Sequence, residues 1–381
     1  MRSGLKVFRE AFTSFLIGII GSLGAGLMLS GMSGTLAVVP ALALLIPGAL
    51  GARGTIYGAL GSKLSSCLHL GLIKRLSWRH HVVRENTEIA HEATLFISLL
   101  LAFIASGLAS FSNISANPFL LFFISVVSGG IAGLILVIFT NFIAFQAFRR
   151  GWDPDNVSAP LISTIGDFLT VPILFGVALL SLRLPELVLQ LFTIAGTVII
   201  LWYVKDHILS ARFLVLPVSI VFQVFAGIFL EQSIPQLLAI PGILVFLPAF
   251  LALGGNLSSF VASRISTQLH LGTIAPEFTL RKNSLSEVLN VTLLSFFIFP
   301  VLGIVTFFIQ DAISSEHVSL IELVRVSWEA GLLTTLVVAI ILGFSVSILS
   351  WRFNFDPDDI TIPVLSAVAD FVGIFFLILV L

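Results

Sequence analysis

The chain has 381 residues, of which 57% are hydrophobic and only 10% are charged. Because soluble domains carry about 25% charged residues, this composition excludes an ordinary soluble domain and predicts an all-α polytopic membrane protein. The formal net charge of −1 gives no indication of a nucleic-acid partner, and the single cysteine, Cys67, cannot form an internal disulfide.

Apolar runs of about 20 residues, the length that crosses a bilayer, recur along the whole chain. The first follows a short basic segment without a small-residue cleavage site, so we expect an uncleaved span rather than a signal peptide. We predict eleven membrane-spanning helices, at about residues 10–32, 35–72, 93–112, 118–148, 158–182, 187–204, 211–231, 236–272, 287–310, 319–350 and 360–381.

Two of these segments, 35–72 and 236–272, are too long to be simple spans. A helix of about 38 residues would reach roughly 57 Å, whereas the hydrocarbon core is about 30 Å thick. Both segments contain proline and clustered glycine, so we expect each to break, to tilt or to project into the cytoplasm.

The basic residues indicate how the helices are oriented, because cytoplasmic loops are enriched in Lys and Arg. With the N-terminus inside, only Arg183 and Arg325 fall at outer ends. The sequence therefore predicts a multi-pass cell-membrane protein with a cytoplasmic N-terminus and an extracellular C-terminus. The inner segments hold Arg2, Lys6, Arg9, Lys74, Arg75, Arg79, Arg84, Arg149, Arg150, Lys205, Arg212, Arg281, Lys282 and Arg352.

The chain repeats itself at a nearly constant spacing. Residues 46–73 match residues 247–274 at an offset of 201, and the segment "DPDNVSAPLISTIGD" (153–167) matches "DPDDITIPVLSAVAD" (356–370) at an offset of 203. Two matches in the same order predict a fused duplicate, with five spans in each half.

We expect repeats at 1–182 and 207–381, joined by a linking transmembrane helix at 186–206. Five spans are an odd number, so direct fusion would invert the second repeat and the linking helix restores its orientation. The repeats should therefore be parallel about a pseudo-twofold axis along the membrane normal. The chain would then act as a monomer that imitates a dimer.

An aspartate stands at the same place in each repeat, Asp167 in the fifth span and Asp370 in the last. A carboxylate inside the bilayer is costly and normally faces a polar partner or a water-filled cavity. Ser163 and Ser366 lie one turn before these aspartates, on the same helix face. Two carboxylates at a central axis would suit Mg²⁺, which keeps several waters and takes one or two carboxylates.

The structural alternative is that each aspartate caps or pairs locally, for instance with Arg53, Lys63 or Arg264. The motif "LGGNL" offers the amide of Asn256 to the pore, and the matching residue of the first half is Thr55. Close helix packing by small residues is the other explanation of this motif.

Other polar residues favour structural roles. His69 and His270 recur at inner helix ends, the His- and Glu-rich segment 74–92 suits a solvated connector, and Glu329 lies one turn after Arg325, where a helix-surface ion pair is expected. Ion entry, metal sensing and an outer-vestibule role are the respective functional alternatives.

The pattern "P…GGN" in a long second span, followed by "DP…P…S/T…D" opening the fifth, resembles the MgtE family of magnesium channels and its animal solute-carrier relatives. The resemblance covers both halves, hence nearly the whole chain. It implies that the family's pore aspartate falls on Asp167 and Asp370, and its carbonyl position on Ser163 and Ser366. The glycine–asparagine motif falls on Gly255 and Asn256, with Gly54 and Thr55 in the first half.

We therefore predict Mg²⁺ or another hard divalent cation as the transported partner, and no enzymatic activity. An exchanger coupled to Na⁺ or H⁺ uses buried carboxylates too and is the first alternative. An intramembrane aspartyl protease, with two aspartates sharing a proton, is the remote one. The sensor domains of MgtE channels, an N-terminal domain and a CBS pair, are not expected within this polypeptide.

Overall fold

The computed structural model describes residues 2–69, 73, 80–112, 114–149, 154–207, 211–238, 242–270, 272–278, 282–313, 319–355 and 357–381. Some residues of the sequence analysis lie outside this part of the chain. They are Asp153 and Asp356, the first residues of the repeated segments 153–167 and 356–370, and residues 74–79 of the predicted connector. The side chain of His69 also lies outside the described part.

Within these described ranges, eleven helical segments are long and apolar enough to cross a membrane, which confirms the predicted all-α polytopic fold. The long helices are α1 (Arg2–Gly31), α3 (Ile46–His69), α4 (His81–Phe111), α5 (Pro118–Arg149), α6 (Pro154–Ser181), α7 (Glu186–Val204), α8 (Ala211–Leu238), α9 (Ile243–His270), α10 (Lys282–Ile313) and α13 (Pro357–Val380). The shorter ones are α2 (Ser33–Val38), η1 (Pro40–Leu44), α11 (Leu320–Thr334), the π-helix η2 (Thr335–Leu342) and α12 (Gly343–Arg352).

The first over-long segment, 35–72, breaks as expected. Val39 has a non-helical backbone, with φ −127° and ψ 77°, because the ring of Pro40 disfavours the helical conformation in the residue before it. The chain here forms α2, the short helix η1 and then α3, so only the last part of the segment is a long helix.

Two boundaries differ from the prediction by several residues. The third span begins at His81 rather than at 93, because the charged residues of 81–92 lower the hydropathy without ending the helix. The span expected from 236 begins at Ile243, since α8 continues to Leu238 and a left-handed glycine, Gly242 with φ +84°, precedes α9.

Helix contacts in one half have counterparts in the other. Helix α6 packs on α1 and α3 as α13 packs on α8 and α9, and α4 packs on α5 as α10 packs on α11. The contacts between the halves are reciprocal, because α1 meets α9 and α10 while α8 meets α3 and α4. This pattern supports the predicted pseudo-twofold relation, although the boundaries 1–182, 186–206 and 207–381 stay a prediction.

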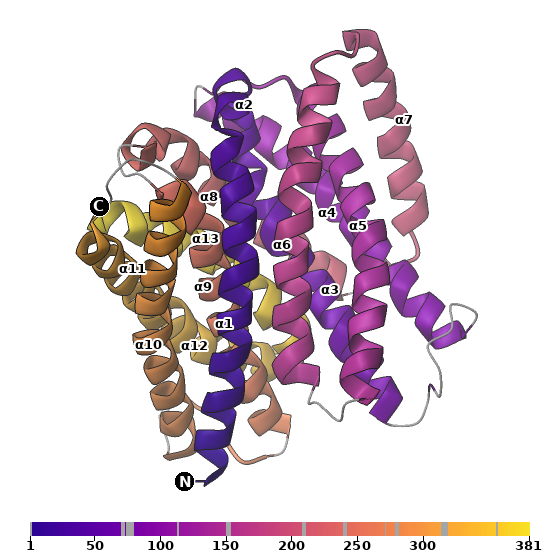
Figure 1. Ribbon diagram of the computed structural model, residues 1–381. Coiled ribbons are helices and arrows are strands. Elements are labelled where there is room, and N and C mark those ends of the chain that lie inside the picture. Colours follow the sequence, from indigo (N-terminus) through magenta and orange to yellow (C-terminus); the bar gives the residue numbers. More distant parts are fainter. Residues whose placement is uncertain are drawn as a thin grey trace.

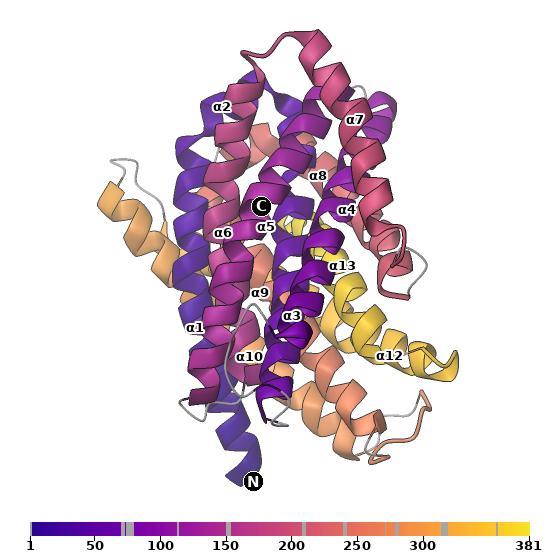
Figure 2. The same ribbon diagram turned by 90° about the vertical axis from the view of Figure 1, so that its right-hand side faces the viewer.

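The linking helix α7 stands apart from this pattern. It packs on α4 and α5 at the periphery of the bundle (Figure 1). Figures 1 and 2 show the N-terminus at one end of the bundle, and α2 and the turn between α6 and α7 at the other.

A pair of glycine contacts is the closest reciprocal feature between the two halves. A Cβ on Gly26 of α1 would lie 1.9 Å from the carbonyl oxygen of Val245, and a Cβ on Gly227 of α8 would lie 2.5 Å from Cα of Leu44. Both pairs are related by the offset of 201. The first long helix of each half, α1 or α8, therefore packs closely against the backbone of the other half, at the start of α9 or in η1, respectively.

Two buried serines form a second matched pair. Ser125 of α5 donates to the carbonyl oxygen of Ser98 at 2.7 Å, and Ser327 of α11 donates to that of Phe299 at 2.6 Å. The acceptors are 201 residues apart, whereas the serines are 202 apart. The π-helix η2 follows Ser327, and beyond it Arg149 and Arg352 correspond at 203.

Candidate metal site

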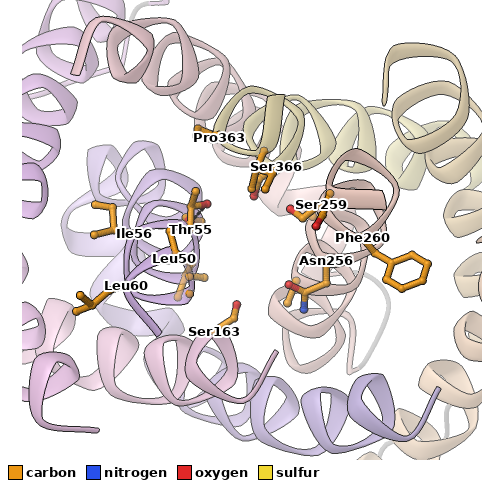
Figure 3. Close-up of a pocket in the computed structure, with 18 of the residues that line it drawn as sticks. Leu50, Thr55, Ile56, Leu60, Ser163, Asn256, Ser259, Phe260, Pro363 and Ser366 are labelled. Atoms are coloured by element: carbon orange, nitrogen blue, oxygen red, sulfur yellow. Dashed lines mark hydrogen bonds between the residues drawn. The ribbon is translucent and has the colours of Figure 1, made fainter. Parts of the chain in front are cut away.

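A cavity of about 700 Å³ lies between the two halves of the bundle. The helices α3, α6, α9 and α13 surround it, and all six residues expected at an ion site line it. Figure 3 shows Ser163 and Ser366 on opposite sides of the opening, with Thr55 and Asn256 facing each other across the other two sides. The predicted residues are Asp167, Asp370, Ser163, Ser366, Asn256 and Thr55.

The cavity lies toward one end of the helix bundle. Its lining runs from Pro47 and Pro248 to Lys63 and Thr267, near the ends of α3 and α9 that lead into the basic connectors. On the other side of the aspartates, η1 and the start of α9 are packed solid, since Leu44 and Val245 are buried in the hydrophobic core. This arrangement leaves the site accessible from the predicted cytoplasmic side and closed on the other.

Glycines let α3 and α9 closely approach α6 and α13, the helices that carry Ser163 and Ser366. A Cβ on Gly54 would lie 2.6 Å from Oγ of Ser163, and one on Gly255 would lie 3.0 Å from Oγ of Ser366. Small residues at helix crossings permit such short distances between backbones. The glycines of the predicted motif therefore serve packing, while Thr55 donates to the carbonyl oxygen of Gly51 at 3.0 Å and Asn256 lines the cavity.

The Asp167 carboxylate is held by a residue that the sequence did not single out. Ser22 of α1 donates to Oδ2 of Asp167 at 2.9 Å, and the two residues are 1% and 4% exposed. A hydroxyl that donates to a buried carboxylate stabilises its charged form. The serine fixes Asp167 in one orientation.

A buried cation, Arg53 of α3, also lies near Asp167. It is 4% exposed and close enough for electrostatic attraction to the carboxylate, although the two make no direct ion pair in the described part of the chain. Its Nη1 donates to the carbonyl oxygen of Ala49. Arg53 does not line the cavity, but its charge offsets part of the −2 that the two aspartates alone would give.

Asp370 lies close enough to Asp167 for mutual electrostatic repulsion and is 5% exposed. The residue at the place of Ser22 is Gln223 of α8, 201 positions later, and its amide faces Asp370. No fixed cation stands beside this carboxylate at the position that matches Arg53, since Gly254 occupies it. The two aspartates therefore share a cavity but have different surroundings.

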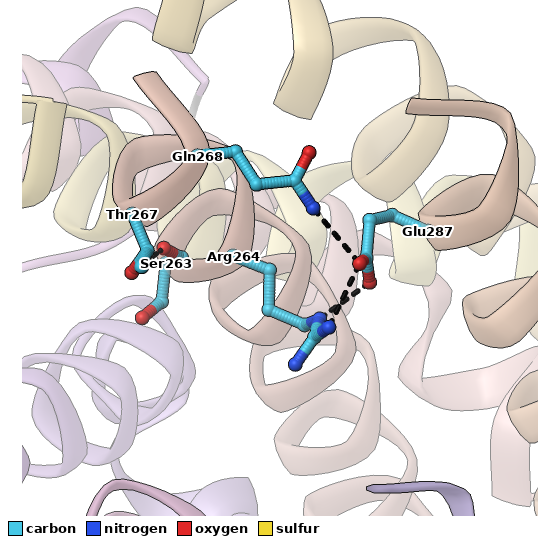
Figure 4. Close-up of polar contacts among 5 residues, drawn as sticks. All are labelled: Ser263, Arg264, Thr267, Gln268 and Glu287. Atoms are coloured by element: carbon cyan, nitrogen blue, oxygen red, sulfur yellow. Dashed lines mark hydrogen bonds and ion pairs between the residues drawn. The ribbon is translucent and has the colours of Figure 1, made fainter. Parts of the chain in front are cut away.

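Arg264, offered by the structural alternative as a partner of an aspartate, has another partner in the structure. It forms an ion pair with the buried Glu287 of α10, and Gln268 donates to the same carboxylate at 2.9 Å (Figure 4). The matching residues of the first half are Lys63 and Asn86, both at the cavity wall. In the described part of the chain, Lys63 has no ion-pair partner.

The weaker candidates have structural surroundings. His270 contacts the carbonyl oxygen of Ser266 and packs edge-on against Trp351, and Arg325 pairs with Glu329 at 3.4 Å on the exposed face of α11. Among the described residues, no three His, Cys, Asp or Glu side chains gather into a metal cluster. Two carboxylates with hydroxyl or amide neighbours are enough for a partly hydrated Mg²⁺.

Known proteins resemble this chain over most of its length. The MgtE family model, described as "Divalent cation transporter", matches residues 46–177 and 247–380. Solute carrier family 41 member 3 of Rattus norvegicus is 25% identical over 362 residues, which cover 87% of this chain and 77% of that protein. Solute carrier family 41 member 2 of Mus musculus is 26% identical over 393 residues, covering 96% and 68%. No solved structure matches.

Proposed function

This chain belongs to the MgtE family of divalent cation transporters, and we propose that it carries Mg²⁺ through the central cavity with Asp167 and Asp370 as the paired ion-binding carboxylates. The observation that carries the proposal is that the six residues expected from the repeat line one cavity, although Asp167 and Asp370 are 203 positions apart. The family consists of transporters rather than enzymes, so the aspartyl-protease alternative is set aside.

The chemistry of the cavity wall supports a hard divalent ion. Oxygen atoms of carboxylates, hydroxyls and an amide face the cavity, and Mg²⁺ prefers oxygen ligands and retains part of its water shell. A volume of about 700 Å³ leaves room for a hydrated ion between the aspartates. Ser163 and Ser366 stand one turn nearer the connectors, on the route by which such an ion would arrive.

The test is Mg²⁺ flux into proteoliposomes that contain purified protein. Replacing both aspartates, Asp167→Asn and Asp370→Asn, should abolish flux while the protein still elutes as a single species. Thr197→Ala, on the peripheral helix α7, is the matched control and should transport like the unmodified protein. Undiminished Mg²⁺ flux in the double variant would overturn the proposal.

One observation favours coupled exchange as a second candidate. Arg53 is close only to Asp167, so in the described part of the chain it leaves the charge of Asp370 without a fixed cation beside it, and one Na⁺ or one proton would neutralise that charge. An exchanger needs such an occupied return state, whereas a simple pore does not. Flux with and without an imposed Na⁺ or pH gradient separates the two, because gradient-independent flux would remove the exchanger.

We also propose that the N-terminus is cytoplasmic, the C-terminus is extracellular and the protein acts as a monomer. The asymmetry of basic residues supports the orientation, and the reciprocal contacts between the halves supply within one chain what a dimer would supply with two. Accessibility of single cysteines introduced before α1 and after α13 to an impermeant reagent checks the orientation.

A further inference from the structure

The surroundings of Asp370 contain two buried oxygen atoms without partners. Oδ2 of Asp370 and Oε1 of Gln223 make no hydrogen bond in the part of the chain that the structure describes. Gln223 is 3% exposed and Asp370 is 5% exposed. Buried polar atoms are nearly always paired, and each exception requires an explanation.

Helix α3 has no side chain at the point where it meets these two groups, because residue 51 is a glycine. The Nε2 atom of Gln223 and Oδ2 of Asp370 lie 2.7 Å and 2.8 Å from the position that a Cβ on Gly51 would take. The two groups therefore meet over the bare backbone of Gly51. At the offset of 201, Gly51 corresponds to Ala252 and Gln223 corresponds to Ser22, so the repeat combines glycine with the long side chain and alanine with the short one.

On the basis of the proposed function, we propose that Asp370 and Gln223 form the half-site whose contacts change as the transported cation binds and leaves, whereas Asp167, the other carboxylate of the pair, keeps fixed partners. Ser22 and Arg53 compensate Asp167 permanently. Among the described residues, Asp370 has neither a hydroxyl donor nor a fixed cation beside it, so it gains most from an incoming ion.

When the ion binds, the side-chain amide of Gln223 rotates by a half-turn about its last torsion. The Nε2 atom of Gln223 lies on the side of the Asp370 carboxylate, although not in the geometry of an ordinary hydrogen bond. A cation beside Oδ2 repels that group and attracts the carbonyl oxygen. The terminal amide torsion is broad and nearly twofold, so a half-turn that places Oε1 beside Oδ2 requires no change of backbone.

Mg²⁺ binding to the purified full chain, measured by calorimetry alongside liposome flux, tests this assignment. Gln223→Leu removes the oxygen and keeps the bulk, so it should weaken binding by about tenfold or more, as losing a supporting ligand of a metal usually does. Gln223→Glu keeps an oxygen in place and should retain binding. Ser22→Ala, the matched change in the other half, should have a clearly smaller effect than Gln223→Leu.

A double variant separates ion binding from packing. Gly51→Ala with Gln223→Ser copies the Ala252 and Ser22 arrangement, so it should restore the fit between helices without restoring Mg²⁺ affinity. Unmodified affinity in this variant, or equal losses in Gln223→Leu and Ser22→Ala, would overturn the inference. If the double aspartate variant still transported Mg²⁺, the proposed function itself would fail instead.

Discussion

The two halves of this protein are alike where they contact each other and different where they meet the ion cavity. Gly26 and Gly227 press against the opposite half in the same way, and Ser125 and Ser327 make the same hydrogen bond. Around the aspartates the matched positions hold Ser22 and Gln223, or arginine and glycine. A fused duplicate can vary its two sites independently, which a homodimer of identical chains cannot do.

The charges differ in their distribution as well. The first half places Arg53 deep beside Asp167 and leaves Lys63 unpaired at the cavity wall, whereas the second half pairs Arg264 with Glu287. Each half thus carries one basic residue near the inner mouth, but only one of them is neutralised within the described part of the chain. The four predictions below concern first the shared contacts and then the differences.

The largest effect is expected where the halves are equivalent. Gly26→Ala and Gly227→Ala each place a Cβ against backbone atoms that cannot move aside, so each should destabilise by about 3 kcal/mol or more. Thermal unfolding in detergent measures this. A Cβ on Gly107 meets nothing within 4 Å, and Gly107→Ala should stabilise by about 0.5–1 kcal/mol. If only one of the variants Gly26→Ala and Gly227→Ala lowered the stability, the result would contradict the equivalence of the two contacts.

The aspartates should differ in stability as well as in binding. Asp167→Asn leaves Arg53 buried without its countercharge, which should cost about 2 kcal/mol, less than the loss of a directly paired charge. Asp370→Asn removes a carboxylate that has no fixed cation, and should be neutral or stabilising in the absence of Mg²⁺. Adding Arg53→Met to Asp167→Asn should recover part of the loss, and a purely additive result would show that the two residues are not coupled.

A smaller effect is expected at the inner mouth. Glu287→Gln breaks the ion pair with Arg264, whose side chain is 33% exposed, so solvent screening should limit the loss to about 1 kcal/mol. Asn86→Ala, the matched change in the first half, breaks no ion pair and should cost less. The comparison uses the same unfolding measurement, and equal losses would mean that the charge of Glu287 is irrelevant to stability.

The smallest effect is expected on the outer side of the second half. Arg325 and Glu329 are both about half exposed and form a one-turn helix pair at 3.4 Å. Glu329→Gln should change stability by no more than about 0.5 kcal/mol, and less at high salt. A marked loss of Mg²⁺ flux in this variant would instead support the outer-vestibule role.

The sequence predicts the number of spans and the residues of the cavity for the same reason, which is that the apolar runs and the polar motifs both recur along the chain. Apolar runs mark the helices, and the doubled motifs mark the helices that face each other. The sequence does not reveal Ser22 and Gln223, because a contact between α1 and α6, or between α8 and α13, leaves no periodic signal in either helix. Extending the offset of 201 to α1 and α8 aligns Gly26 with Gly227, and this extension would have placed both residues.

Charge balance was the harder part to predict. Arg53 was recognised as a possible partner of the aspartates, but its burial depends on how α3 packs on α4 and α5, which hydropathy does not describe. The early start of α4 at His81 has a similar cause, since its polar first turns extend the helix beyond its apolar part. Composition determines which segments enter the bilayer but not which polar groups meet there.

The π-helix η2 has a consequence for the inheritance of the site. The offset between matched residues grows from 202 at Ser327 to 203 at Arg352, so the second half holds one additional residue in this stretch. A wide π turn takes up a single insertion locally, without rotating the helix on either side. Ser366 and Asp370 lie on α13, beyond this stretch, and line the cavity together with Ser163 and Asp167. The second half therefore holds one additional residue without losing the alignment of the proposed ion-binding groups.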